Sequence, residues 1–210
     1  EFFFFFIGEK VLNYKSRIQN WTYRGAVTYN NKIDAKNTLQ VGTKYALHGF
    51  KNSIDQSQNN ADELTSMTDF NEDISTISNF ASLKHRLNEK ITIIGGVHNM
   101  NVLYNQKSTI EPRLAINWQV GENSSFSAGY GKHSTMESVH NYFAQVKQAD
   151  GSLAEPNKDL DLLKADHYVL GYEKRLEKNM RLKVEAYYQS LYNLPVENVD
   201  TSYYSTINEG

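Results

Sequence analysis

IEPRLAINWQVGENSSFSAGYGKHS, residues 110–134, is the stretch that decides the fold. Its first half alternates apolar and polar side chains with a period of two, as a strand with one apolar and one polar face does. The apolar row is Leu114, Ile116, Trp118 and Val120, and the polar row is Arg113, Ala115, Asn117 and Gln119. Residues 121–124 form a polar turn, after which the apolar row continues with Phe126, Ala128 and Tyr130. The stretch therefore predicts a β-hairpin whose two apolar rows share one face.

Composition favours strands and excludes several kinds of site. The chain has 14 tyrosines, 10 phenylalanines and only 3 prolines, which favours strands and turns over helices. A net charge of −2 without a basic cluster gives no electrostatic case for nucleic acid. Since cysteine is absent, disulfides, thiolate metal sites and a cysteine nucleophile are excluded. The mean hydropathy of −0.60 is compatible with a membrane β-barrel, in which only every second residue faces lipid.

Alternation elsewhere predicts further strands, which cover residues 17–29, 39–47, 74–87, 91–104, 167–173 and 180–192, with a last strand-like piece at 203–210. The outward row of residues 74–87 is ambiguous, because Ile77, Ala81 and Leu83 compete with Phe80. In the next strand, Gly95-Gly96 predicts either a bulge or the close approach of a neighbour.

The connections alternate in length along the chain. Tight turns are expected at 30–34, 88–90, 121–124 and 177–179, and looser connections at 51–73, 105–109, 135–164 and 194–201. All tight turns then lie at one end of a meander, as in outer-membrane barrels. The fold class predicted is all-β: an antiparallel up-and-down transmembrane β-barrel segment of about eight or nine strands, each about 10–13 residues long. The apolar row of the opening hairpin then faces lipid rather than a core.

Several stretches resemble the β-barrel region of TonB-dependent outer-membrane receptors. They are Glu111–Ile116, Phe126–Gly131, Ala165–Glu173, Leu182–Asn193 and the closing Ser205–Gly210, which is similar to the family's N-x-G strand start. One departure is His98 in Gly95-Gly96-Val97-His98, where the family often has G-L-R. The resemblance covers most of residues 15–210. Residues 1–14 are interpreted as a lead-in or boundary, because the Phe2–Phe6 run has no preceding basic residue and is too short for a targeting signal.

The resemblance implies a barrel of about 22 strands around a plug. It implies active import of a scarce nutrient of the siderophore, cobalamin or glycan class, with energy relayed by TonB, in the bacterial outer membrane. Lipid, the TonB complex acting through the plug, and a small ligand or metal chelate are the implied partners. Residues 15–210 would be one wall segment without the plug or the C-terminal strands, and no enzyme. The alternatives are a passive porin-like barrel and a soluble secreted β-sandwich that acts as a binding module.

No catalytic, cofactor-binding or metal-binding residue is predicted. The lumen-facing candidates are Arg113, Arg181, Lys183 and Glu185, and the candidates for lipid-facing or girdle positions are Trp21, Tyr23, Tyr29, Trp118, Tyr130, Tyr188 and Tyr192. His133, His140 and His167 flank the longest loop with Asp159, Asp161 and Asp166. Their spacing matches no compact metal motif, which favours solvated side chains. A hydrolase with His133 or His140 as general base is a third alternative, although no G-x-S-x-G motif occurs.

Overall fold

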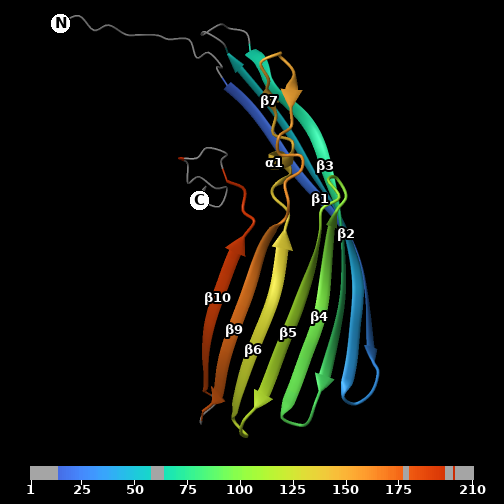
Figure 1. The fold of residues 1–210 in the computed structure, drawn as a ribbon, viewed down its shortest axis with the longest axis vertical. Helices are drawn as coiled ribbons and strands as arrows, with labels where there is room; N and C mark the ends of the chain where they lie inside the picture. The colour runs from blue at the N-terminus through green and yellow to red at the C-terminus, as the bar shows by residue number, and fades with distance from the viewer. Residues whose placement is uncertain (1–13, 58–63, 177–179, 197–200, 202–210) are drawn as a thin grey trace, which may run out of the picture.

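Eight antiparallel strands form one curled sheet, shaped like half a barrel (Figure 1). The structure is a computed structural model that describes residues 14–57, 64–176, 180–196 and 201. The strands of this sheet, in order, are β1 Tyr14–Lys32, β2 Asn37–Ser57, β3 Leu64–Arg86, β4 Ile91–Val102, β5 Ser108–Gln119, β6 Ser124–Thr135, β9 Leu163–Arg175 and β10 Arg181–Tyr192. This order confirms the predicted all-β, up-and-down arrangement. Within the described residues no helix has the length and apolar character needed to cross a membrane.

The tight turns lie together at the lower end of the sheet in Figure 1, as predicted. Two of them are closed by a side chain that binds the backbone ahead of it. Asp34 accepts hydrogen bonds from the N–H groups of Lys36 (2.7 Å) and Asn37 (2.8 Å). Asn88 closes its turn in the same way. The fourth predicted turn, 177–179, and the strand-like piece at 203–210 lie outside the described residues.

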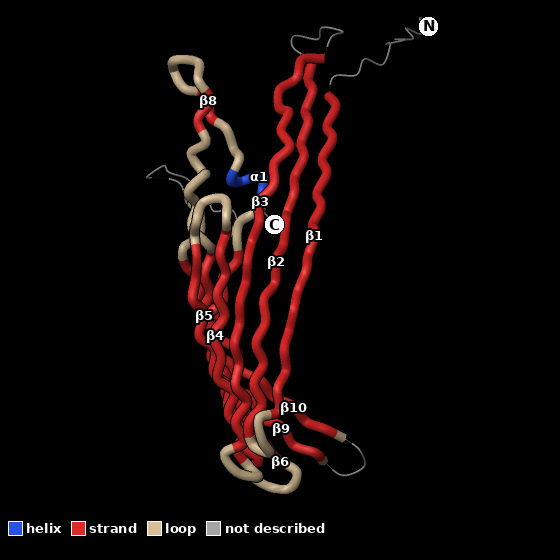
Figure 2. Tube along the Cα trace, turned by 90° about the vertical axis from the view of Figure 1, so that its right-hand side faces the viewer, coloured by secondary structure: helices blue, strands red, loops and turns tan. Residues whose placement is uncertain are grey.

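The prediction of a loop at 51–73 was wrong. β2 and β3 run through most of this tract, with lengths of 21 and 23 residues, and their pairing continues to Ser57 and Leu64 with a bulge at Ile54/Asp55. Figure 2 shows β1, β2 and β3 rising past the ends of β4 and β5. Ladder hydrogen bonds come from the backbone, so strands can continue through a mostly polar tract without a regular alternation in the sequence.

The register settles the faces of β3 and β4. β4 pairs with β3 and β5 without a shift, so Gly95-Gly96 forms no bulge. The other reading, close approach of a neighbour, is confirmed at Gly96, where a Cβ would lie 3.0 Å from the Ala81 carbonyl oxygen. In β3 the pairs place Ile77, Ala81 and Leu83 on one face. Phe80 lies on the other face, above Gly42, where a Cβ would lie 2.5 Å from its ring.

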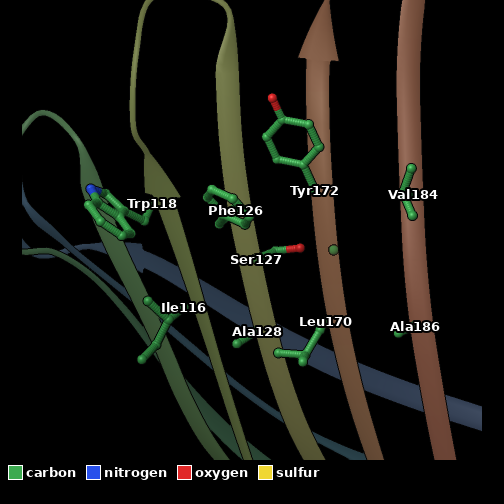
Figure 3. Close-up of a pocket in the computed structure, with 10 residues that line it drawn as sticks. Ile116, Trp118, Phe126, Ser127, Ala128, Leu170, Tyr172, Val184 and Ala186 are labelled. Atoms are coloured by element: carbon green, nitrogen blue, oxygen red, sulfur yellow. The ribbon is translucent and has the colours of Figure 1, made fainter.

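One face of the sheet is apolar from β1 to β10. We call it the apolar face and define it by the cross-strand rows Trp118, Phe126, Tyr172 and Val184, then Ile116, Ala128, Leu170 and Ala186, then Leu114, Tyr130, Tyr168 and Tyr188. Aromatic rings stack along these rows, with centroids 4.8 Å apart for Phe126 and Tyr172 and 5.1 Å for Tyr130 and Tyr168. The two alanines of the middle row, Ala128 and Ala186, leave a shallow apolar depression of about 390 Å³ (Figure 3). Large apolar side chains on this face stay exposed, because no second layer covers them within the described residues.

The opposite, polar face is concave and carries the buried core. The segment between β6 and β9 contains α1 Val139–Tyr142 and a small hairpin of β7 Val146–Lys147 and β8 Leu153–Ala154, where the sequence showed only an unpatterned stretch. It packs on β3 and β4 through a group that we call the loop cluster: Ile74, Val102, Tyr142, Phe143 and Leu162. A connection from β6 to β9 reaches β3 and β4 directly only across the concave side.

Candidate functional site

A buried carboxylate organises the polar face near the upper end of β5. Glu111 is 1% exposed, and its Oε2 lies 2.9 Å from His98 Nδ1 and accepts a hydrogen bond from Arg113 Nη2 at 3.0 Å. Its Oε1 accepts from Thr109 Oγ1 at 3.1 Å and from the Ser134 hydroxyl. Burying a carboxylate is costly unless it is paired and hydrogen-bonded. Four partners meet that requirement and leave Glu111 little capacity to act as a base or a ligand.

The strand period builds this network. Thr109, Glu111 and Arg113 lie two residues apart on β5 and therefore point to the same face. His98 is the cross-strand partner of Glu111 on β4. His98 thus places a ring nitrogen beside the Glu111 carboxylate. The pairing was not predicted, because it depends on the β4–β5 register and the sequence showed no alternation there.

The six histidine and aspartate residues around the longest loop fall into separate environments. His133 and His167 lie together, with ring centroids 4.6 Å apart, and Gly131 leaves space for the His133 ring. His140 instead packs 5.3 Å from the Phe50 ring, beside the loop cluster. Asp166 accepts a hydrogen bond from the Tyr130 hydroxyl at 2.9 Å. Asp159 takes part neither in this hydrogen bond nor in the two histidine ring contacts. In the described part of the chain, no three His, Asp or Glu side chains are arranged to hold a metal ion.

Asp161 ties the end of the long connection to β9. Its carboxylate accepts hydrogen bonds from the Leu162 N–H at 2.8 Å and from Lys164 Nζ at 3.0 Å. Partial burial raises the pKa of Asp161, but the two donors lower it by a larger amount. The net result is a pKa below the usual value. These donors therefore favour the charged carboxylate, which accepts the hydrogen bond from Leu162 of the loop cluster.

The predicted site residues separate between the two faces. Arg113, Arg181, Lys183 and Glu185 all lie on the polar face. All four take part in ion pairs within the sheet: Arg113 with Glu111 at 3.0 Å, Arg181 with Glu173 at 2.5 Å, and Lys183 with Glu185 at 2.8 Å. The seven aromatic candidates share the apolar face: Trp21, Tyr23, Tyr29, Trp118, Tyr130, Tyr188 and Tyr192. That the polar face meets the lumen and the apolar face meets lipid stays a prediction.

A groove of about 590 Å³ crosses the sheet from β2 to β9. Its polar lining includes Gln40, Arg113 and the histidines His98, His133 and His167, and Phe80 adds an aromatic ring. The arrangement offers hydrogen-bond donors and aromatic surface along a concave wall, and it suits contact with a polar ligand or another polar segment.

Comparison with known proteins identifies the family. The profile of the family described as "TonB dependent receptor-like, beta-barrel" matches residues 2–210, whereas no curated protein sequence matches the chain. Similar solved structures include the copper transporter OprC (12% identity, TM-score 0.66, covering 85% of this chain and 31% of that one). The siderophore receptor PirA from Pseudomonas aeruginosa is 12% identical with a TM-score of 0.60, and the match covers 84% of this chain and 32% of that one. The RagAB peptide importer in its "closed-closed" state is 12% identical with a TM-score of 0.58, and the match covers 85% of this chain and 24% of that one.

The chain spans between 24% and 32% of the length of these three proteins. At this identity the likeness shows the fold alone, and it agrees with the curled antiparallel sheet and its alternating turns. The family profile covers nearly every residue and confirms the resemblance seen in the strand motifs. The chain therefore belongs to the TonB-dependent receptor family, as part of its β-barrel.

Proposed function

We propose that this chain is a wall segment of a TonB-dependent importer in the bacterial outer membrane, with its apolar face toward lipid and its polar face toward the lumen. The observation that carries the proposal is the single-layered sheet with one apolar face from β1 to β10. Burying apolar surface stabilises a protein in water by about 25 cal/mol per Å², and surface that stays exposed lacks this contribution. A bilayer removes this penalty, whereas a soluble β-sandwich would need a second layer over the same rows.

Barrel closure supports the same proposal. β1 and β10 each have one unpaired edge among the described residues, and unpaired backbone groups are costly in hydrocarbon. The closed wall then needs further strands, which we assign to other parts of the same protein together with a plug. The family consists of transporters and receptors, which supports import rather than catalysis.

Uptake measurements test the proposal. Cells that express the whole protein, with and without TonB, are grown with limiting iron chelate, limiting cobalamin or a glycan as sole carbon source. We expect a protein-dependent gain in cellular iron, in cellular cobalt or in glycan-supported growth, and we expect this gain to vanish without TonB. A gain that persists without TonB would favour the passive porin-like barrel. No gain with any of the three nutrients, from protein located in the outer membrane, would contradict import of these classes.

A further inference from the structure

The depression on the apolar face is bounded by two ridges of aromatic rings. The ridge beside the tight turns is Trp118, Phe126 and Tyr172, with ring centroids 6.5 and 4.8 Å apart in that order. The other ridge is Tyr130, Tyr168 and Tyr188, with spacings of 5.1 and 6.1 Å. Ala128 and Ala186 lie between the two ridges, beside the first of them in Figure 3. The depression is therefore a trough across β5, β6, β9 and β10, about 14 Å long.

The ridge beside the tight turns is incomplete at β10. There the cross-strand partner of Tyr172 is Val184, a small aliphatic side chain in place of a ring. Val184 lines the depression together with Ala186, which follows it by two residues on β10. A hydrocarbon chain can therefore enter the depression across Val184, from the end of the sheet where the tight turns lie.

A basic side chain stands at this open corner. Lys174 follows Tyr172 by two residues on β9 and therefore points to the apolar face, where its direct cross-strand partners are Ser124 and Leu182. Val184 is one of its diagonal neighbours, at a distance of about 7–8 Å. Lys174 is exposed, and it takes part in none of the ion pairs among the described residues.

No carboxylate lies beside Lys174 on the apolar face of the described strands. The preceding residue, Glu173, points to the polar face and pairs there with Arg181. Glu122, in the turn between β5 and β6, lines a small polar pocket together with Glu173. The charge of Lys174 is therefore available to a partner outside the sheet.

The position of Lys174 matches the headgroup level of the inner leaflet. In outer-membrane barrels the short turns lie at the periplasmic end, and Lys174 is one row nearer to these turns than the aromatic ridge. Aromatic rings favour the membrane interface, and long basic side chains reach from there to the headgroups. We infer that the depression and Lys174 form a seat for an anionic glycerophospholipid of the inner leaflet, with an acyl chain in the depression and its phosphate at Lys174.

Both halves of this seat contribute to binding. An acyl chain fills the space that the two alanines leave and contacts the rings on either side. Such packing is what holds apolar groups together inside a bilayer, where excluding water contributes nothing. One basic side chain near the bilayer surface favours an anionic headgroup over a zwitterionic one about fivefold. The inference rests on the proposed function in that the apolar face must meet lipid, and it adds the lipid class and its position.

Native mass spectrometry of retained lipid tests the headgroup half of the seat. The whole protein is reconstituted in vesicles of phosphatidylcholine and phosphatidylglycerol, extracted in mild detergent, and its bound lipids are identified by mass. The wild type should retain phosphatidylglycerol about fivefold in excess of its share in the vesicles, and Lys174→Gln should lose this excess. Lys51→Gln is the matched control, because Lys51 lies on the same face of β2 towards the other end of the sheet, opposite Gln19. It should leave the excess unchanged.

Ala186→Leu tests the acyl-chain half of the seat. Its larger side chain points to lipid and fills the depression, so the variant should retain several-fold less of both phospholipids. Ala81→Leu is the matched control, because Ala81 lies on the apolar face of β3 between Val41 and Val97, outside the depression. It should retain as much of both lipids as the wild type.

Wild-type protein that retains the two lipids in their vesicle proportions would overturn the inference. Equal losses in Lys174→Gln and Lys51→Gln, or in Ala186→Leu and Ala81→Leu, would overturn it too. So would lipopolysaccharide in place of phospholipid on protein purified from outer membranes, because it would assign the seat to the outer leaflet. Protein that does not enter the vesicles would contradict the proposed membrane placement as well, whereas selective lipid retention without TonB-dependent uptake would contradict the proposed import alone.

Discussion

At the scale of single residues, the polar face holds two kinds of ion pair. Glu111 is almost completely buried and is shared by Arg113 and His98, whereas the side chains of Lys183 and Glu185 are 50% and 48% exposed. Removing one partner of a buried pair leaves a charge without compensation, but an exposed pair contributes little because water screens it. The same chemical change should therefore have different effects at the two positions.

We expect Glu111→Gln to lower the free energy of unfolding by about 2–3 kcal/mol, less than for a fully buried pair because Arg113 keeps contact with water. The matched variant Glu185→Gln should cost less than about 1 kcal/mol. Urea unfolding of the whole protein in lipid vesicles measures both changes. Equal losses at the two positions would show that Glu111 does not hold this part of the wall together.

At the scale of elements, sequence reasoning succeeded where one face of a strand is apolar and failed where that contrast is missing. The hairpin of β5 and β6 was predicted from Leu114, Ile116 and Trp118. The upper halves of β2 and β3 were missed, because residues 51–73 are mostly polar and show no regular alternation, although Phe50 and Phe70 pack on each other there with ring centroids 5.3 Å apart. The pair of His98 and Glu111 was missed for a related reason, since it depends on a register that Gly95-Gly96 obscured.

The loop cluster was missed because a short helix with a few apolar side chains has no period to detect. Tyr142 is fully buried between the long connection and the strands, and its ring packs edge-on against Tyr104 at 6.3 Å. Its hydroxyl accepts only a long hydrogen bond, 3.4 Å from the Glu137 N–H. Packing of the Tyr142 ring, rather than its hydroxyl, therefore dominates the contribution of this residue to the stability of the loop cluster.

Tyr142→Ala should release residues 136–162 from the polar face, because truncating a buried aromatic side chain costs about 3–5 kcal/mol. Hydrogen exchange followed by mass spectrometry should show faster exchange in this segment, while β5, β6 and β9 stay protected. Tyr142→Phe keeps the ring and should leave exchange nearly unchanged. Unchanged exchange in Tyr142→Ala would mean that other contacts fix the loop.

At the scale of the whole molecule, the two faces of the sheet differ in side-chain chemistry, but their side chains are similarly exposed. Val184 and Glu185 are neighbours on β10 that point to opposite faces. Val184 is 55% exposed and the Glu185 side chain 48%. The sheet itself therefore shields neither position, and any difference in their reactivity reports what covers each face in the cell.

Cysteine labelling at these two positions tests the central claim, that the apolar face meets lipid and the polar face meets water. The chain has no cysteine, so Val184→Cys and Glu185→Cys each introduce one thiol into it, in whole protein freed of any other cysteine. In intact outer membranes, a charged maleimide should label Glu185→Cys and spare Val184→Cys, and a lipophilic pyrenyl maleimide should label Val184→Cys. Equal labelling of both positions by the charged reagent, or the reverse pattern, would contradict the account.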